Sequence, residues 1–300
     1  MESIDSITLN FSRENMFFLN LSLGFIMFGV ALNLKVSDFL MILRQPRAVI
    51  AGMLSQFVAL PMLTFIMILI IEPRPSFALG MMLVAACPGG NISNFFSSVA
   101  RGNIALSVSL TAVSSVLAIL LTPLNLAFWA GYYEPTASLL QQVNLEFSDV
   151  LRTVLIILGI PVVLGMSFNR FLPETARKLH PYTHYGSILI FGAILILAFM
   201  ANLDIFVNYI YLVVLLVFMH NAIALITGFQ IGKVFGVSEQ DRRTISIETG
   251  IQNSGLGLLL IFAFFQGLGG MAIVAAWWGI WHILAGFAVS YYWKSKVILT

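Results

Sequence analysis

The sequence predicts an all-α polytopic membrane protein, and its composition is the main reason for that prediction. Hydrophobic residues make up 59% of the 300 residues and charged residues only 9%, whereas a soluble domain has about 25% charged residues. So few charges could not cover the surface of a chain of this length in water. The charges are also unevenly distributed, which leaves long apolar runs. The net charge of +2 gives no reason to expect a nucleic-acid partner.

Nine transmembrane helices are predicted from the runs that lack Asp, Glu, Lys and Arg. A bilayer core of about 30 Å needs about 20 apolar residues per helix. The last run, from Thr249 to Trp293, is too long for one helix, and Gly267, Gly269 and Gly270 offer a break. The predicted spans are residues 16–36, 47–71, 76–100, 104–131, 149–169, 185–206, 209–235, 243–266 and 270–293.

The basic residues predict how these helices are oriented in a cell membrane. On one side the nine spans place Lys35, Arg44, Arg47, Arg101, Arg170, Arg177, Lys178, Lys233, Arg242, Arg243, Lys294 and Lys296, and on the other only Arg13, Arg74 and Arg152. Because basic residues concentrate in cytoplasmic loops, residues 294–300 are expected to be a cytoplasmic tail and residues 1–15 an external segment. No cleaved signal is expected, and whether Asn10 is glycosylated stays open.

Glu248 is the only acidic residue that these predictions place well inside a span. A charge at the bilayer centre costs roughly 2.5–3.5 kcal/mol on insertion scales. One interpretation is that Glu248 lies near the cytoplasmic end of its helix, solvated or paired with Arg242 or Arg243. The segment from Glu248 to Gly257 is, however, rich in glycine, carboxamides and hydroxyls, which is unfavourable for a helix that faces lipid. This pattern favours a helix broken inside the protein or beside a water-filled cavity.

A second interrupted segment lies in the first half of the chain, in the sequence CPGGNISN from Cys87 to Asn94. Pro88 removes a backbone donor and disturbs the preceding turn, and two glycines follow it. Alone, this pattern is equally consistent with a simple proline kink. Two polar, interrupted segments, one in each half of the chain, instead indicate a transporter site built from inverted repeats.

Oxygen-bearing side chains in neighbouring spans favour a cation site near Glu248. Gln56 is the one carboxamide in its span, and Ser107 and Thr111 are four residues apart and share a helix face. With Glu248 they would supply one carboxylate and neutral oxygens, without sulfur or clustered imidazole. Such ligands suit an alkali cation better than a transition metal. Cys87 has no base fixed beside it by the sequence and is expected to be a small buried residue.

The paired motifs CPGGNISN and ETGIQN resemble those of the bile acid:sodium symporter family, and the resemblance extends over nearly the whole chain, including ARGNIALSVSLT. It implies a core domain from residues 47–131 and 209–293 and a panel domain from residues 16–36, 149–169 and 185–206. The two broken helices would cross near the bilayer centre. Nine spans resemble the animal members, since many bacterial members have ten.

The resemblance also implies the site residues. One sodium ion would be held by Ser93, Asn94, Ser107, Thr111 and Glu248, and a second by Gln56, Glu248 and Gln252 with backbone carbonyls of Thr249 and Ile251. An organic anion would lie beside the crossing, near Asn91, Asn253 and His282. Histidines in apolar helices are more often packing residues than ligands, which leaves His282 and His220 open to that alternative.

These features predict a sodium-coupled symporter that imports an organic anion, either a bile acid or a smaller carboxylate such as pantoate, by alternating access. No cofactor other than sodium as the coupling ion is expected. The alternative is a proton-coupled carrier of the same fold with Glu248 as proton acceptor. A channel is disfavoured because no ring-forming repeat is present. An enzyme is disfavoured because the chain lacks H-E-x-x-H, G-x-S-x-G and paired intramembrane aspartates.

Overall fold

A computed structural model describes residues 4–5, 7, 13–32, 34, 41–142, 152 and 154–296, and within them all regular structure is helical. In this described part of the chain, four helices are long and apolar enough to cross a membrane, and two shorter apolar helices accompany them. The chain is therefore a multi-pass membrane protein. The long helices are Pro46–Ile71, Ile104–Tyr132, Phe206–Val234 and Gly269–Lys294, and the short ones are Pro75–Ala86 and Ser254–Phe264.

The described residues form sixteen helical elements. In chain order they are α1 (Arg13–Ala31), α3 (Met41–Arg44), α4 (Pro46–Leu54), the π-helical turn η1 (Ser55–Ala59), α5 (Leu60–Ile71), α6 (Pro75–Ala86), α7 (Ile92–Val99), α8 (Ile104–Tyr132), α9 (Glu134–Gln142), the π-helical turn η2 (Leu155–Gly159), α11 (Ile160–Phe171), α12 (Pro173–Ala201), α13 (Leu203–Val234), α14 (Glu239–Gly250), α15 (Ser254–Phe264) and α16 (Gly269–Lys294).

Two of the predicted spans are broken in the middle. The first is α6 followed by α7, because the residue before a proline favours extended backbone and Cys87 accordingly has φ −70° and ψ 158°. The second is α14 followed by α15, with α14 ending at Gly250. Both breaks lie within the two polar segments that the sequence singles out.

The two breaks meet each other through backbone hydrogen bonds. Gly89 and Gln252 form an antiparallel bridge. The Gly90 N–H donates to the carbonyl of Ile251 at 2.7 Å, and the Asn253 N–H donates to the carbonyl of Pro88 at 2.8 Å. These bonds satisfy polar backbone groups that the helix breaks would otherwise leave unpaired in a water-poor interior. They also fix the crossing of the two broken helices at one point.

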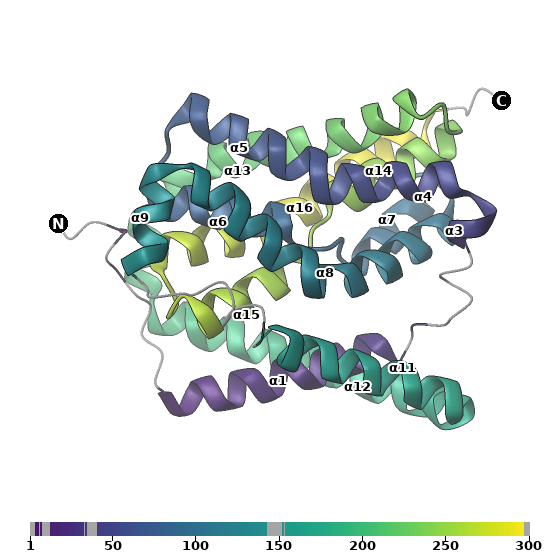
Figure 1. Cartoon of the computed structure of the whole chain (residues 1–300), viewed down its shortest axis with the longest axis horizontal. Helices are drawn as coiled ribbons and strands as arrows, with labels where there is room; N and C mark the ends of the chain where they lie inside the picture. Colours follow the sequence, from purple (N-terminus) through teal and green to yellow (C-terminus); the bar gives the residue numbers. More distant parts are fainter. Residues whose placement is uncertain are drawn as a thin grey trace.

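The helices gather into two groups, which Figure 1 shows one below the other. Helices α1, α11 and α12 pack on one another in the lower part of that view. The remaining long helices form the upper group, in which α16 packs against α6 and α13, and α13 against α14. Contacts of α1 with α15, and of α8 with η2, join the two groups.

The close approach of α13 and α14 explains why residue 228 on α13 is a glycine. A Cβ atom on Gly228 would lie 2.6 Å from both the carbonyl oxygen of Ile245 and the Cα of Ser246. Only a residue without a Cβ lets the backbones of these two helices come so near. α14, which bears Glu248, is thereby held directly against the long helix α13.

The structure corrects several predicted boundaries. The largest difference concerns α12, which begins at Pro173 rather than at residue 185, so that His180 lies on a helix and not in the loop expected there. Pro173 occupies the first helical position, where its missing N–H costs nothing. The predicted loop around residues 207–208 is helical as well, since α12 ends at Ala201 and α13 starts at Leu203.

Smaller differences occur at other ends. α1 starts at Arg13, inside the predicted external segment 1–15, and ends at Ala31. α14 begins four residues before the predicted span 243–266, because the Ser238 hydroxyl caps it by accepting from the Asp241 N–H at 3.1 Å. The short helix α9 is not predicted at all. Of the predicted span 149–169, residues 149–151 and 153 lie outside the described residues, as do residues 33 and 35–36 of the first span.

Candidate cation and anion site at the helix crossing

Glu248 lies at the crossing with its carboxylate buried, at 2% exposure. The Ser93 hydroxyl donates to one carboxylate oxygen at 2.5 Å, and the Thr111 hydroxyl donates to the other at 2.8 Å. Ser93 comes from α7 and Thr111 from α8, so three helices place these groups together. Two neutral hydroxyls do not offset the charge of a buried carboxylate.

In the part of the chain that the structure describes, no arginine neutralises the Glu248 carboxylate. Arg243 is fully buried but pairs with Glu239 on the preceding turn of α14. Its remaining donors reach the carbonyls of Ala100, at 3.1 Å, and Trp293, at 3.0 Å. Among the residues that the structure describes, no basic side chain forms an ion pair with Glu248. The interpretation of Glu248 as a residue paired with Arg242 or Arg243, or solvated at a helix end, is therefore wrong.

Gly89 allows the carboxylate to lie against the other broken helix. A Cβ atom at this position would overlap the Glu248 Oε1 atom and lie 2.7 Å from its Cδ. The absence of a side chain at the first break is thus required for the carboxylate of the second helix to reach Ser93 and Thr111. The glycine pair after Pro88 therefore does more than loosen the helix.

The first predicted group of ligands is assembled around Thr111. Its hydroxyl oxygen lies 2.8 Å from Glu248 Oε1, 3.0 Å from the carbonyl oxygen of Ser107 and 3.5 Å from Asn94 Oδ1. One hydroxyl proton cannot serve three acceptors, so this cluster has more oxygen acceptors than hydrogen donors. The Ser107 hydroxyl instead donates to Ser97, at 3.2 Å. Oxygen-rich clusters with too few protons are suited to hard cations.

The second predicted group forms a chain of carboxamides. Gln56 lies on η1, and its amide donates to the Cys87 carbonyl at 2.7 Å and to Gln252 Oε1 at 2.8 Å. The Gln252 amide donates to the Thr249 carbonyl at 2.6 Å. The Ile251 carbonyl accepts the Gly90 N–H. The Gln56 Oε1 atom is buried and has no hydrogen-bond partner, which leaves one acceptor free for a cation.

Three residues expected near an organic anion line one cavity of about 540 Å³. Asn91 lies immediately before α7 and Asn253 immediately before α15, so both half-helices begin at this cavity. The Asn253 side chain caps α15 by accepting from the Leu256 N–H at 3.0 Å. The third, His282 on α16, is almost fully buried, and its Nδ1 atom has no hydrogen-bond partner. Helix N-termini with free donors favour negative groups.

His220 and Asn221 have packing roles. The His220 Nε2 atom lies 2.7 Å from the Thr64 hydroxyl, and its ring packs against Trp278 with centroids 4.6 Å apart. The Asn221 amide donates to the carbonyl of Gly250 at 2.7 Å. That carbonyl is one that the end of α14 leaves without a helical partner. Asn221 therefore stabilises the break that precedes Gln252.

Sequence reasoning missed two residues that build this site. Ser97 binds the Ser107 hydroxyl, and the Ser55 hydroxyl lies 2.9 Å from the Thr249 hydroxyl. The spacing of Ser93 and Ser97, four residues apart and thus on one helix face, is a signal that could have identified Ser97. No local pattern marks Ser55, because its partner is 194 residues away.

A multi-pass membrane protein with two broken helices that cross at a buried carboxylate is typical of secondary transporters. Comparison with known proteins agrees: the model of the Sodium Bile acid symporter family matches residues 20–209. The chain belongs to this family, whose members are transporters and not enzymes.

Relatives from bacteria, plants and animals support this assignment. The uncharacterized sodium-dependent transporter YocS of Bacillus subtilis is 31% identical over 294 residues, which cover 96% of this chain and 88% of that protein. The probable sodium/metabolite cotransporter BASS1, chloroplastic, of Arabidopsis thaliana is 29% identical over 90% of this chain, but the chain spans only 65% of its length. The sodium-dependent organic anion transporter of Bos taurus is 27% identical over 86% of this chain and 71% of its own.

Proposed function

We propose that this protein is a sodium-coupled symporter that imports an organic anion across the cell membrane by alternating access. The observation that supports it most is the buried Glu248 carboxylate, which lies among oxygen acceptors at the crossing and has no basic partner among the described residues. A cation at this place would neutralise the carboxylate, since leaving a charge uncompensated inside a protein is costly. The relatives named for sodium dependence point to sodium as that cation.

The first proposed sodium site comprises Ser93, Asn94, Ser107, Thr111 and Glu248. The Ser107 contribution is its carbonyl oxygen, which already lies 3.0 Å from the Thr111 hydroxyl, or its hydroxyl after release from Ser97. The second proposed site comprises Gln56, Glu248 and Gln252 with the carbonyls of Thr249 and Ile251. The free Gln56 Oε1 atom supports it. Because Glu248 belongs to both, its charge couples the two sites.

The proposed passenger is a bile acid or a smaller carboxylate such as pantoate, held in the 540 Å³ cavity by Asn91, Asn253 and His282. The relative from Bos taurus named for organic anions supports this class of substrate. Helices α1, α11 and α12 would form the panel domain, and α4 to α8 with α13 to α16 the core domain. Rocking of one against the other would alternate access, with nine spans in the bilayer.

The proposed orientation has the N-terminus outside and the C-terminus in the cytoplasm. In Figure 1, the C-terminal end of α16, the short helix α3 and the start of α14 lie at one end of the molecule, while α9 lies at the other. The first of these ends bears basic residues such as Arg44, Arg242 and Lys294. Basic residues concentrate on the cytoplasmic side of membrane proteins.

Uptake into proteoliposomes tests the proposal and separates it from its alternative. With radiolabelled taurocholate and pantoate as probes, an inward sodium gradient at constant pH is expected to drive accumulation, whereas a potassium gradient is not. The alternative carrier, in which Glu248 accepts a proton, predicts accumulation under an inward proton gradient without sodium. Accumulation driven by the proton gradient alone would replace the sodium-coupled proposal with that alternative.

A further inference from the structure

Three cavities are lined in part by residues of α1, α11 and α12 or of the segment that follows α1. The first is the 540 Å³ cavity at the crossing. The second, of about 200 Å³, shares Val30, Asn91 and Ser187 with the first. The third, of about 480 Å³, shares Leu34 with the second. Cavities that share wall residues are neighbours, so the three can be ordered as a series that begins at the half-helix N-termini.

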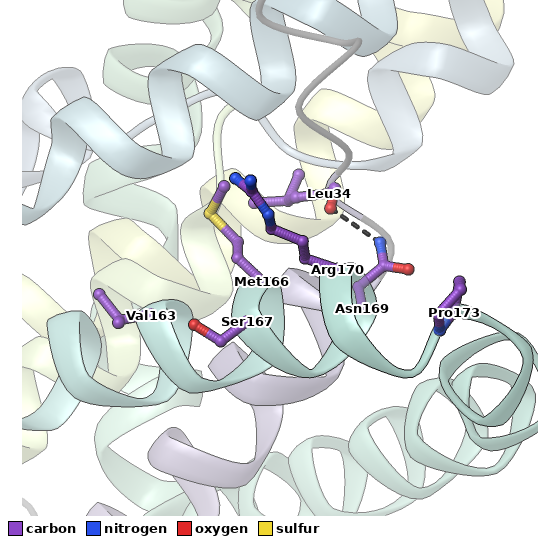
Figure 2. Close-up of a pocket in the computed structure, with 7 residues that line it drawn as sticks. All are labelled: Leu34, Val163, Met166, Ser167, Asn169, Arg170 and Pro173. Atoms are coloured by element: carbon purple, nitrogen blue, oxygen red, sulfur yellow. Dashed lines mark hydrogen bonds between the residues drawn. The ribbon is translucent and has the colours of Figure 1, made fainter.

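The third cavity contains a guanidinium group. Arg170 lies in the last turn of α11, and Figure 2 shows Arg170 and Met166 extending from α11 into the region beside Leu34. The wall at this point is held in place, because the Asn169 amide donates to the Leu34 carbonyl at 2.9 Å. The cavity therefore combines a long-range positive charge with apolar walls.

Arg170 is the one charged residue among the described residues that line the three cavities, which include no Asp or Glu. Glu248 lies behind this lining and accepts a hydrogen bond from Thr111, which lines the second cavity. The acidic residue nearest in sequence, Glu174, already binds Arg177 at 2.5 Å. A cleft with charge of one sign and low-dielectric walls concentrates ions of the opposite charge. The series is thus matched to an anion that carries apolar bulk.

We propose that Arg170 is a steering residue that attracts the transported organic anion along these cavities, between the crossing and the aqueous phase at the α11–α12 end. The identity of the transported substrate rests on the proposed function, but the attraction of anions by Arg170 does not depend on sodium. The described residues that line the cavity of Arg170 include no member of the two proposed sodium sites. Its effect is on the local concentration of anions in these cavities and on the rate at which they pass between the crossing and the cytoplasmic side, and not on coupling.

Cysteine labelling at Val30 tests this role without a transported substrate. The chain has one cysteine, Cys87, which is fully buried, so Val30→Cys adds the accessible thiol at the boundary of the first two cavities. The protein is kept in discs of neutral phosphatidylcholine. Two methanethiosulfonate reagents of similar size are compared, one with a sulfonate and one with a trimethylammonium group. Each rate is divided by the rate of that reagent with a small free thiol.

The normalised rate is expected to be higher for the sulfonate reagent than for the trimethylammonium reagent. Arg170→Gln in the same background is expected to lower the ratio of these two rates by about threefold or more. An effect of this size is expected from one partly screened charge. Arg170→Lys keeps the charge and is expected to keep the ratio. Lys178→Gln, which removes an exposed charge from the neighbouring helix α12 outside the cavities and leaves the Glu174–Arg177 pair intact, is the matched control and is expected to change the ratio little.

Three results would overturn the proposal: no reaction at Val30→Cys with either reagent, a ratio that Arg170→Gln leaves unchanged, or an equal fall in Lys178→Gln. Each protein is first checked to be monodisperse in the discs, so that unfolding is not mistaken for a change in the ratio. The outcome is independent of the proposed function. If the labelling ratios are as expected but uptake does not depend on sodium, only the symporter proposal is refuted. If uptake depends on sodium but the ratios do not change with Arg170→Gln, only the steering role is refuted.

Discussion

Replacing Glu248 with Gln is expected to abolish sodium-driven accumulation of the organic anion, with a loss of about a hundredfold or more in initial rate. The substitution keeps the shape of the side chain and removes its charge. Removing one partner of a buried charge pair costs roughly 3–5 kcal/mol, and each 1.4 kcal/mol corresponds to tenfold in affinity. Because Glu248 belongs to both proposed sodium sites, both are expected to weaken together. The measurement is uptake into proteoliposomes under an inward sodium gradient.

The matched control for this variant is Glu174→Gln. Glu174 forms an exposed ion pair with Arg177 on α12, and such pairs contribute about 0–1 kcal/mol. Its uptake rate is expected to equal that of the wild type. If Glu248→Gln still accumulated the anion in response to sodium at a rate near the wild-type one, the central role of the buried carboxylate would have to be abandoned.

Substituting Gly89 with Ala is expected to reduce the apparent affinity for sodium by about tenfold or more, which corresponds to about 1.4 kcal/mol. The added Cβ would occupy the space of the Glu248 carboxylate, whose Cδ lies 2.7 Å from the position of that atom. The carboxylate must then move away from Ser93 and Thr111. The measurement is the sodium concentration that gives half-maximal uptake.

Gly131→Ala on α8 is the control for the Gly89 variant, because a Cβ at Gly131 meets nothing within 4 Å. In a helix, alanine is favoured over glycine by about 0.5–1 kcal/mol, so no loss of sodium affinity is expected. An unchanged half-maximal sodium concentration in Gly89→Ala would mean that the carboxylate does not need its observed position, and would contradict the cation site as described.

The sequence alone predicted the places at which the helices break, because Pro88 and the glycines at 89, 90 and 250 act locally. It could not show that the Gly89 and Gln252 backbones pair with each other, since that contact joins residues far apart in the chain. The resemblance of the motifs supplied the expectation of a crossing. The geometry that makes Gly89 necessary, the approach of Glu248, appears only in three dimensions.

The start of α12 was predicted at residue 185 instead of Pro173 because the prediction relied on hydropathy. Residues 173–184 are polar and basic, and hydropathy alone favours a loop there. Helix formation, however, depends on capping and on tertiary support as well as on apolar runs, and Pro173 begins a helix that continues through this segment to Ala201. The sequence analysis considered Arg243 only as a possible partner of Glu248. Its observed partner, Glu239, lies four residues before it on the same helix, a spacing that brings opposite charges together and that could have predicted the pair.

Sodium-specific stabilisation of the purified protein is the most direct test of the cation site. The melting temperature is measured against increasing sodium chloride, with potassium chloride keeping the ionic strength constant, for the wild type and Glu248→Gln. A ligand that binds only the folded state adds about 2.7 kcal/mol of stability at a hundred times its dissociation constant. The expected result is a saturable rise with sodium in the wild type that is lost in Glu248→Gln. Equal melting temperatures in sodium and potassium for the wild type would contradict a sodium site at the helix crossing.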